Sequence, residues 1–419
     1  MSESIKATSR YGGVRALALG LAATALVLGG RGGGSGARSQ SVGSAGQATS
    51  ERTPTTTAEP AKGAETGMPG TVDLSAGLVG SASCRECHPG ESALHSRSGH
   101  ARTLRPAAST AVARWLDGRK VEDPERPGAT WTYAIAHGTL EAEHAEKGRY
   151  HCIPLDLAVG SGTNGMTFVT LGAPAFEGGP LTGREHRLSF LETSKAMEVT
   201  PGQGKDDSMS HRRGINELGR SLESYELAKC LGCHATLTSR SNPIELDRAA
   251  LIPNVGCERC HGPGAEHIAA ARRGDPDEKL IMTLGAADRA GSAVHQIVLC
   301  GQCHRNADNV GSSQMSEDNA EIARFQPLGL ELSKCFQRGK SGLSCVSCHD
   351  PHAKVEEGPA RYENVCKSCH SPALKTVCPV NTTDGCIQCH MPERPVSVVF
   401  RFTDHWIRKP KAKKPAGKP

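Results

Sequence analysis

The five-residue pattern Cys-x-x-Cys-His occurs seven times in this chain. Two thiols three residues apart, followed directly by an imidazole, form the attachment site of c-type haem: the thiols bond to the porphyrin and the histidine binds the iron. The cysteines are Cys84, Cys87, Cys230, Cys233, Cys257, Cys260, Cys300, Cys303, Cys345, Cys348, Cys366, Cys369, Cys386 and Cys389. The histidines are His88, His234, His261, His304, His349, His370 and His390. The pattern predicts seven covalently attached haems, each with one iron ion.

Zinc is the alternative ligand for such cysteine pairs, because Cys-x-x-Cys also forms zinc knuckles. Every Cys-x-x-Cys in the chain is followed at once by histidine, although only 18 of the 419 residues are histidine. Zinc sites pair two knuckles across a gap and rarely use a contiguous Cys-His. The sequence therefore favours haem.

The second axial ligand decides what each iron can do. Eleven histidines lie outside the motifs, so seven further imidazoles are numerically available. His267 and His352 follow motif histidines by only six and three residues, too close to reach the far face of their own haems. If they are ligands, each binds a neighbouring haem. His100 and His405 follow the first and last motifs at distances that allow the same reach.

The other histidines carry less information. His95 and His295 could be ligands or ordinary polar residues. The remaining five are expected to be surface residues or hydrogen-bonded core residues: His137, His144, His151, His186 and His211.

Composition sets an expectation for the fold. Only 4% of residues are aromatic and 37% hydrophobic, which is little for a core of this size. Haem rings supply large apolar surfaces instead. We therefore expect a mainly α-helical chain with much irregular coil, packed around stacked haems. Apolar periodicity predicts helices over 215–231, 266–273 and 318–325.

The interval between the first two motifs differs from the rest. It spans 146 residues from His88 to His234. Alternating residues at 131–137, 150–159 and 166–171 predict strands. The Gly-x-Gly-x-x-Gly pattern at 160–165 precedes a strand rather than a helix, so it predicts a hairpin turn and not a phosphate site. These features predict a small β-rich insertion.

The N-terminus has the character of an export signal. Lys6, Arg10 and Arg15 precede an apolar run at 16–30 that is short for a membrane span. A cleaved signal is expected, with an uncleaved anchor as the alternative, and both imply a periplasmic location. The predicted segments are 1–37 signal peptide or anchor, 38–75 flexible linker, 76–112 first haem-binding segment, 113–210 β-rich insertion, 211–407 six-haem domain and 408–419 disordered basic tail.

Charge indicates the kind of partner. The chain has a net charge of +5, residues 1–45 hold +4 and residues 408–419 hold +6, so the part between them carries −5. The haem propionates would make it more acidic. Nothing suggests nucleic-acid binding. The expected partners are other redox proteins or quinol-linked membrane complexes.

Four stretches carry a resemblance to a known family. They are Cys-Glu-Arg-Cys-His-Gly-Pro-Gly-Ala-Glu-His at 257–267, Leu-Ser-Cys-Val-Ser-Cys-His-Asp-Pro-His at 343–352, Gly-Cys-Ile-Gln-Cys-His-Met-Pro at 385–392 and Thr-Asp-His-Trp-Ile at 403–407. Together they resemble the multihaem cytochromes c with a cytochrome c-552/4 type of domain, related to the tetrahaem carrier of nitrifying bacteria and to octahaem hydroxylamine oxidoreductases. The likeness covers about 82–407.

The resemblance implies closely stacked, mostly bis-histidine haems that pass electrons in the periplasm. It implies distal-ligand roles for His100, His267, His352 and His405. Two positions depart from the family: Phe400 stands where relatives often have histidine, and Asn164 lies in a turn that sometimes carries one. No Cys-x-x-Cys-Lys occurs, so the lysine-ligated catalytic haem of pentahaem nitrite reductases has no counterpart.

Three cysteines lie outside the motifs. Cys335 and Cys378 recur in relatives, as the resemblance has it, and could pair as a disulfide in an exported protein. Cys152 would then be the odd thiol.

Two functions follow from these patterns. We predict an electron carrier. The alternative is an oxidoreductase that acts on a small nitrogen or sulfur oxyanion, of the nitrite, hydroxylamine or tetrathionate type, at a five-coordinate haem. His137, His186, His211 and Arg187 could then serve as proton donors or anion ligands, but the sequence places none of them beside an iron, and it assigns no catalytic residue.

Overall fold

The computed structural model describes residues 74, 76–172, 180–205, 214–242, 244–276, 293–338, 342–355, 358–374, 377–381, 383–397 and 400–410. The chain divides into two units, residues 1–64 and 65–419, and all described residues lie in the second. The predicted signal or anchor, nearly all of the linker, His211 and most of the basic tail therefore lie outside the described residues. No helix among the described residues combines the length and apolar character needed to cross a bilayer.

A four-stranded antiparallel sheet follows the first haem motif. Its order is β2 (Lys120–Glu122), β3 (Thr130–Ala136), β4 (Thr139–Glu146) and β5 (Arg149–Leu155). Two-residue turns with positive φ at both positions, His137–Gly138 and Lys147–Gly148, join β3 to β4 and β4 to β5. Such turns match the twist of antiparallel strands, so local turn chemistry fixes the register of this sheet.

An eight-stranded sheet contains strands that precede and follow the four-stranded sheet in the sequence. The path is β1 (Leu104–Pro106), β6 (Leu157–Val159), β7 (Gly165–Leu171), β8 (Gly183–His186), β12 (Gly219–Leu222) and β11 (Ile215–Asn216), with β9 (Leu188–Leu191) on β7 and β10 (Ala196–Val199) on β9. Residues 160–165 join β6 to β7 in antiparallel pairing. The hairpin predicted there is confirmed.

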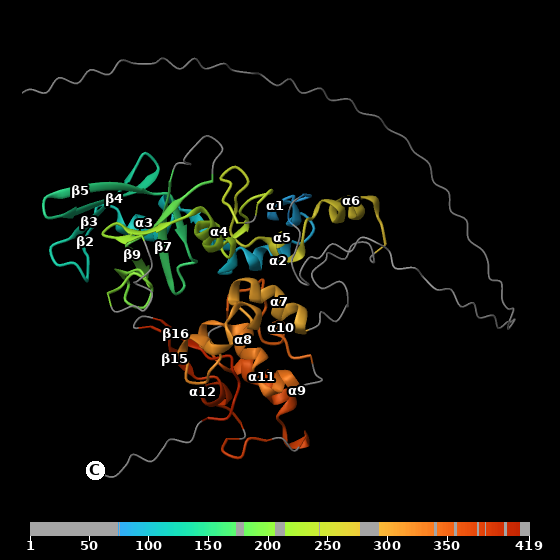
Figure 1. Cartoon of the computed structure of the whole chain (residues 1–419). Coiled ribbons are helices and arrows are strands. Elements are labelled where there is room, and N and C mark those ends of the chain that lie inside the picture. The colour runs from blue at the N-terminus through green and yellow to red at the C-terminus, as the bar shows by residue number, and fades with distance from the viewer. Residues whose placement is uncertain are drawn as a thin grey trace, which may run out of the picture. The chain divides into compact units, whose positions relative to one another are not determined.

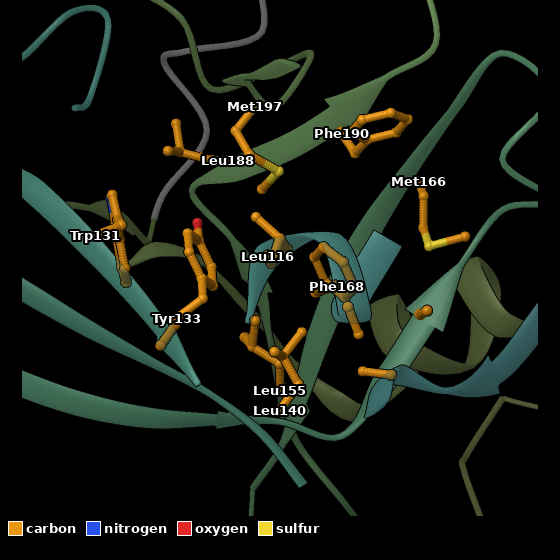
Figure 2. Packing of buried hydrophobic residues seen from close by; sticks show 14 residues of the cluster. Leu116, Trp131, Tyr133, Leu140, Leu155, Met166, Phe168, Leu188, Phe190 and Met197 are labelled. Carbon is orange, nitrogen blue, oxygen red and sulfur yellow. The ribbon is translucent and has the colours of Figure 1, made fainter. Parts of the chain in front are cut away.

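The main apolar core belongs to these strands and to α3 (Ala111–Leu116). Figure 2 shows its large side chains gathered between the strands and this helix. Trp131, Tyr133 and Phe168 are fully buried. Burying each such side chain stabilises the fold by roughly 1.5–3 kcal/mol, so this part of the chain has a core that needs no cofactor.

One polar pair sits inside that core. His186 is fully buried, and its Nε2 lies 2.9 Å from the hydroxyl of Tyr133. Burial lowers the pKa of His186 to about 3, so the imidazole is neutral at neutral pH. A neutral buried imidazole depends on this hydrogen bond, because an unpartnered polar atom in a core is costly.

Replacing Tyr133 with phenylalanine should therefore lower the free energy of unfolding by about 1–3 kcal/mol, since it leaves His186 without this partner. Denaturant unfolding of the full-length protein measures the change. Tyr150→Phe is the matched control, because Tyr150 is 69% exposed, and it should have no effect. Equal unfolding midpoints for the two variants would contradict the prediction.

The haem-motif half consists of short helices joined by coil, coloured from yellow to red in Figure 1. These are α1 (Ser81–Cys84), α2 (Pro89–His95), α4 (Ser224–Gly232), α5 (Cys257–His261), α6 (Ala265–Arg273), α7 (Ala293–His304), α8 (Gln326–Glu331), α9 (Lys334–Arg338), α10 (Cys345–Cys348), α11 (Ala360–Cys369) and α12 (Cys386–His390); α1 and α2 belong to the first motif and are blue. Two small antiparallel pairs accompany them: β13 (Ala235–Leu237) with β14 (Ile252–Pro253), and β15 (Glu393–Pro395) with β16 (Arg401–Thr403).

The prediction of a mainly α-helical fold is wrong. Helices account for 35% and strands for 23% of the described residues, and the largest element is the eight-stranded sheet. Nor are the strands confined to a small insertion, because β1 precedes residue 113 and β11 to β16 follow residue 210. Backbone pairing, and not haem alone, organises much of the chain.

The three predicted helices have different outcomes. The helix over 266–273 is confirmed as α6. The segment 318–325 contains a 3-10 helix, Ala320–Arg324. The helix over 215–231 is wrong in its first half, where β11 and β12 pair instead and α4 begins only at Ser224. Gly219 has φ +123, and a Cβ there would lie 2.0 Å from the carbonyl oxygen of Glu185, so this position suits the sheet and not a helix.

Candidate functional site

A single cavity of about 5380 Å³ borders all seven motifs. A pocket for one small ligand measures roughly 300–1,000 Å³, so this space suits several large groups. Its wall includes all seven motif histidines and every motif cysteine except Cys389. The donor set is the one that c-type haem requires, and the cavity provides room for the rings beside it.

Short helices present the motifs to the cavity. The motifs at 257–261 and 386–390 are helical throughout, and α7 ends on the motif histidine His304. In a helical turn, side chains at positions i and i+3 share a face. Both thiols of a motif therefore point towards the same ring, and the histidine that follows lies next to it.

Thiols of different motifs also lie against one another. Cys233 shares a hydrogen bond with Cys303, and Cys300 shares one with Cys345. The motifs at 230–234, 300–304 and 345–349 are therefore neighbours in space.

Four pairs of imidazoles lie close together in the wall of the cavity. Their ring-centroid distances are 6.2 Å for His88 and His267, 6.3 Å for His100 and His304, 5.9 Å for His261 and His352, and 6.2 Å for His349 and His405. A metal–imidazole bond is about 2 Å long, so two imidazoles on opposite sides of one metal have ring centres about 6 Å apart. The four separations match this geometry.

Each pair joins one motif histidine to one histidine from outside the motifs. The outside members are His100, His267, His352 and His405, the four singled out by their spacing. None of them faces the histidine of the motif that directly precedes it in the chain. The pairs therefore tie together segments that are distant in sequence.

Hydrogen bonds orient the ring of His405 and that of the motif histidine His390. His405 Nδ1 lies 3.0 Å from the carbonyl oxygen of Thr403, and His390 Nδ1 lies 2.9 Å from that of Arg408. This contact leaves Nε2 for a metal, as is usual for ligating histidines. Burial lowers the pKa of His405 to about 4, so the ring is in the neutral form that a metal requires.

The remaining histidines are placed differently. His95 ends α2 and lines the cavity, and His295 lies near the start of α7. His137, His144, His151 and His186 lie in or between the strands of the two large sheets, and none of them lines the cavity. Arg187 is bound in the β-sheet region by Asp123 and Glu125, at 3.0 and 2.9 Å.

The non-motif cysteines and the two departures from the family also have defined places. Cys335 and Cys378 are free thiols in the structure, and both line the cavity. Cys152 is exposed on β5. Phe400 and Asn164 line the cavity as well.

The sequence did not single out three buried carboxylates of the haem-motif half. Glu258 and Asp404 are 2% and 0% exposed and Glu363 is 3% exposed. Glu363 accepts a hydrogen bond from the backbone of Ile387, which connects the sixth motif with the seventh. No sequence signal marks these three residues as buried, because Glu86, which also lies inside a haem motif, has a side chain that is 69% exposed.

Known proteins resemble parts of the chain. The family model described as cytochrome c554 and c-prime matches residues 189–262, which contain the second and third motifs. The multiheme cytochrome MtrA of Shewanella baltica (strain OS185) is 25% identical over 174 residues, which are 39% of this chain and 48% of that protein. The chain thus matches about half the length of this relative. Among solved structures, the outer cell wall cytochrome OcwA is similar at 15% identity and a TM-score of 0.41, over 80% of each chain.

Proposed function

Because this chain belongs to the multihaem cytochromes c, we propose that it carries electrons between redox partners through seven covalently bound haems. When bound, haem supplies a one-electron iron couple. The chain's own residues do the rest: fourteen thiols tether the rings, and seven motif histidines bind the irons. The support is that all seven motifs border one continuous cavity.

The four imidazole pairs support a carrier role for four of the seven proposed haems. His100, His267, His352 and His405 act as distal ligands to the haems of the fourth, first, third and fifth motifs. An iron with two imidazoles has no open position for a substrate. Separations of 5.9–6.3 Å between ring centres support this assignment. Such haems exchange electrons and leave bonds unchanged.

The location and the partners belong to the same proposal. Export to the periplasm follows from the N-terminal pattern of basic and apolar residues. Redox proteins or quinol-linked membrane complexes would supply and accept the electrons. Residues 76–112 and 211–407 are proposed as the haem-binding segments, with 113–210 between them.

Haem content of the exported protein tests the count. The mass of the mature chain should exceed that of the processed polypeptide by seven haems, and a haemochrome assay should give seven per chain. Substituting both cysteines of one motif, Cys366 and Cys369, should remove one haem from the mass. A colourless protein, or one whose mass is that of the bare chain, would contradict the proposal.

Electron paramagnetic resonance of the oxidised protein separates the carrier from the oxidoreductase. The carrier should give low-spin signals that nitrite and cyanide do not alter. A substantial high-spin ferric signal that either anion perturbs would favour the oxidoreductase with a five-coordinate haem.

A further inference from the structure

Glu258 occupies the first variable position of the third motif, and its carboxylate lies inside the protein. The side chain accepts three backbone hydrogen bonds: Oε1 from Val79 and Gly264, at 2.8 and 2.9 Å, and Oε2 from Gly80, at 2.8 Å. Two of these donors are almost 180 residues away in sequence. Hydrogen bonds to a charged acceptor are about twice as strong as neutral ones, so this carboxylate is a strong anchor.

The donors lead to the two imidazoles of one pair. Gly80 directly precedes α1, which ends on Cys84 of the first motif and is followed by His88. Gly264 directly precedes α6, whose third residue is His267. The rings of His88 and His267 face each other at 6.2 Å. The segment that leads to each of these histidines donates a backbone hydrogen bond to Glu258.

Neighbouring hydrogen bonds hold the same two segments together. The backbone N–H of Cys257 donates to Ser81 Oγ at 3.2 Å, and that of Ala265 donates to the carbonyl of Gly77 at 3.1 Å. The Glu258 carboxylate accepts hydrogen bonds from the backbone of both segments at once.

The charge of Glu258 is close to the first motif. No ion pair with Glu258 is found in the part of the chain that the structure describes, whereas buried Asp404 is paired with two arginines. The thiol of Cys84, in the first motif, lies in contact with that of Cys257, the residue directly before Glu258. A buried negative charge beside a haem stabilises the ferric form over the ferrous form and so lowers its reduction potential.

We propose that Glu258, a residue of the third motif, is the positioning residue of the first motif's haem: it holds His88 and His267 opposite each other, and its buried charge lowers the potential of that haem. The inference rests on the proposed function, because it requires haem at the first motif. It assigns to one carboxylate both the ligand geometry and the potential of a neighbouring site.

The charge is tested by Glu258→Gln against Glu86→Gln. Glu86 lies in the first motif itself, but its side chain is 69% exposed and it is 3.6 Å from Arg272. Redox titration followed by the haem absorbance should show one haem at a higher potential in Glu258→Gln and the wild-type potentials in Glu86→Gln. Unchanged potentials in Glu258→Gln, or equal shifts in both variants, would overturn the assignment of the charge.

The positioning role is tested by Glu258→Ala, which removes all three hydrogen bonds. The expected result is the loss of one low-spin haem equivalent from the electron paramagnetic resonance spectrum, with its replacement by a high-spin signal or by a chain one haem lighter. A seven-haem Glu258→Ala protein with the full wild-type low-spin intensity would overturn the positioning role. A wild-type protein without haem at the first motif would instead contradict the proposed function, so the two failures are distinguishable.

Discussion

Replacing His352 with alanine should convert one low-spin haem to a high-spin haem. The ring of His352 lies 5.9 Å from that of His261, with an angle of 7° between their planes, which makes it the most nearly parallel of the four pairs. Without this imidazole, the iron bound by His261 keeps one axial ligand and its ligand field weakens. We expect about one haem equivalent to leave the low-spin electron paramagnetic resonance signal and to appear in the high-spin signal.

The control is His151→Ala. His151 is exposed on β5 and does not line the cavity, so its removal should leave the spectrum unchanged. His267→Ala should give the same conversion as His352→Ala, but at the first motif's haem. The new open position in His352→Ala should also bind cyanide, which the wild-type haem excludes. A wild-type spectrum for His352→Ala would remove His352 from the proposed ligands.

The facing histidines show what local spacing reveals and what it omits. A five-residue motif is recognisable without any fold, because the chemistry of attachment lies within one turn of chain. Spacing alone also indicated that His267 and His352 could not bind their own haems. It did not indicate which motif each one faces. The pairing of His100 with His304 joins residues about 200 positions apart, and only the folded chain brings them together.

Average composition concealed the β-sheet core. An aromatic content of 4% is little for a core of this size. The structure instead concentrates these residues: Trp131, Tyr133, Phe168 and Phe190 belong to one cluster in the β-rich half. Alternation predicted β3, β5 and β7 but missed β4, which is the longest strand among the described residues. Strands of two to four residues, such as β11 and β12, are too short for a clear period of two.

Buried carboxylates were missed for a related reason. The sequence alone does not distinguish Glu258 from exposed Glu86, since both occupy variable positions of a haem motif. Their difference comes from what packs over them, which for Glu258 is a segment almost 180 residues away. Such residues can be recognised only once long-range contacts are known.

The side chain of Asp404 supports a segment that carries a proposed ligand of one haem and contacts the ligand of a second haem. It is fully buried, and its Oδ2 lies 2.8 Å from Arg408 Nη2 and 3.5 Å from Arg394 Nη1. The next residue, His405, faces His349 at 6.2 Å. The carbonyl oxygen of Arg408 lies 2.9 Å from His390 Nδ1 in the seventh motif. Asp404 therefore fixes the segment from His405, a proposed distal ligand, to Arg408, whose carbonyl oxygen contacts the motif histidine His390.

Asp404→Ala should lower the free energy of unfolding by about 3–5 kcal/mol, since removing one partner of a buried ion pair leaves the other charges uncompensated. It should also turn the haem bound by His349 high-spin, because His405 loses its anchor. Glu317→Gln is the matched control. Glu317 also contacts Arg408, but at 4.0 Å and with a side chain 42% exposed, and exposed ion pairs contribute at most about 1 kcal/mol. Denaturant unfolding and electron paramagnetic resonance measure the two effects. If both variants unfold at the same denaturant concentration and keep the wild-type spectrum, Asp404 does not hold these ligands.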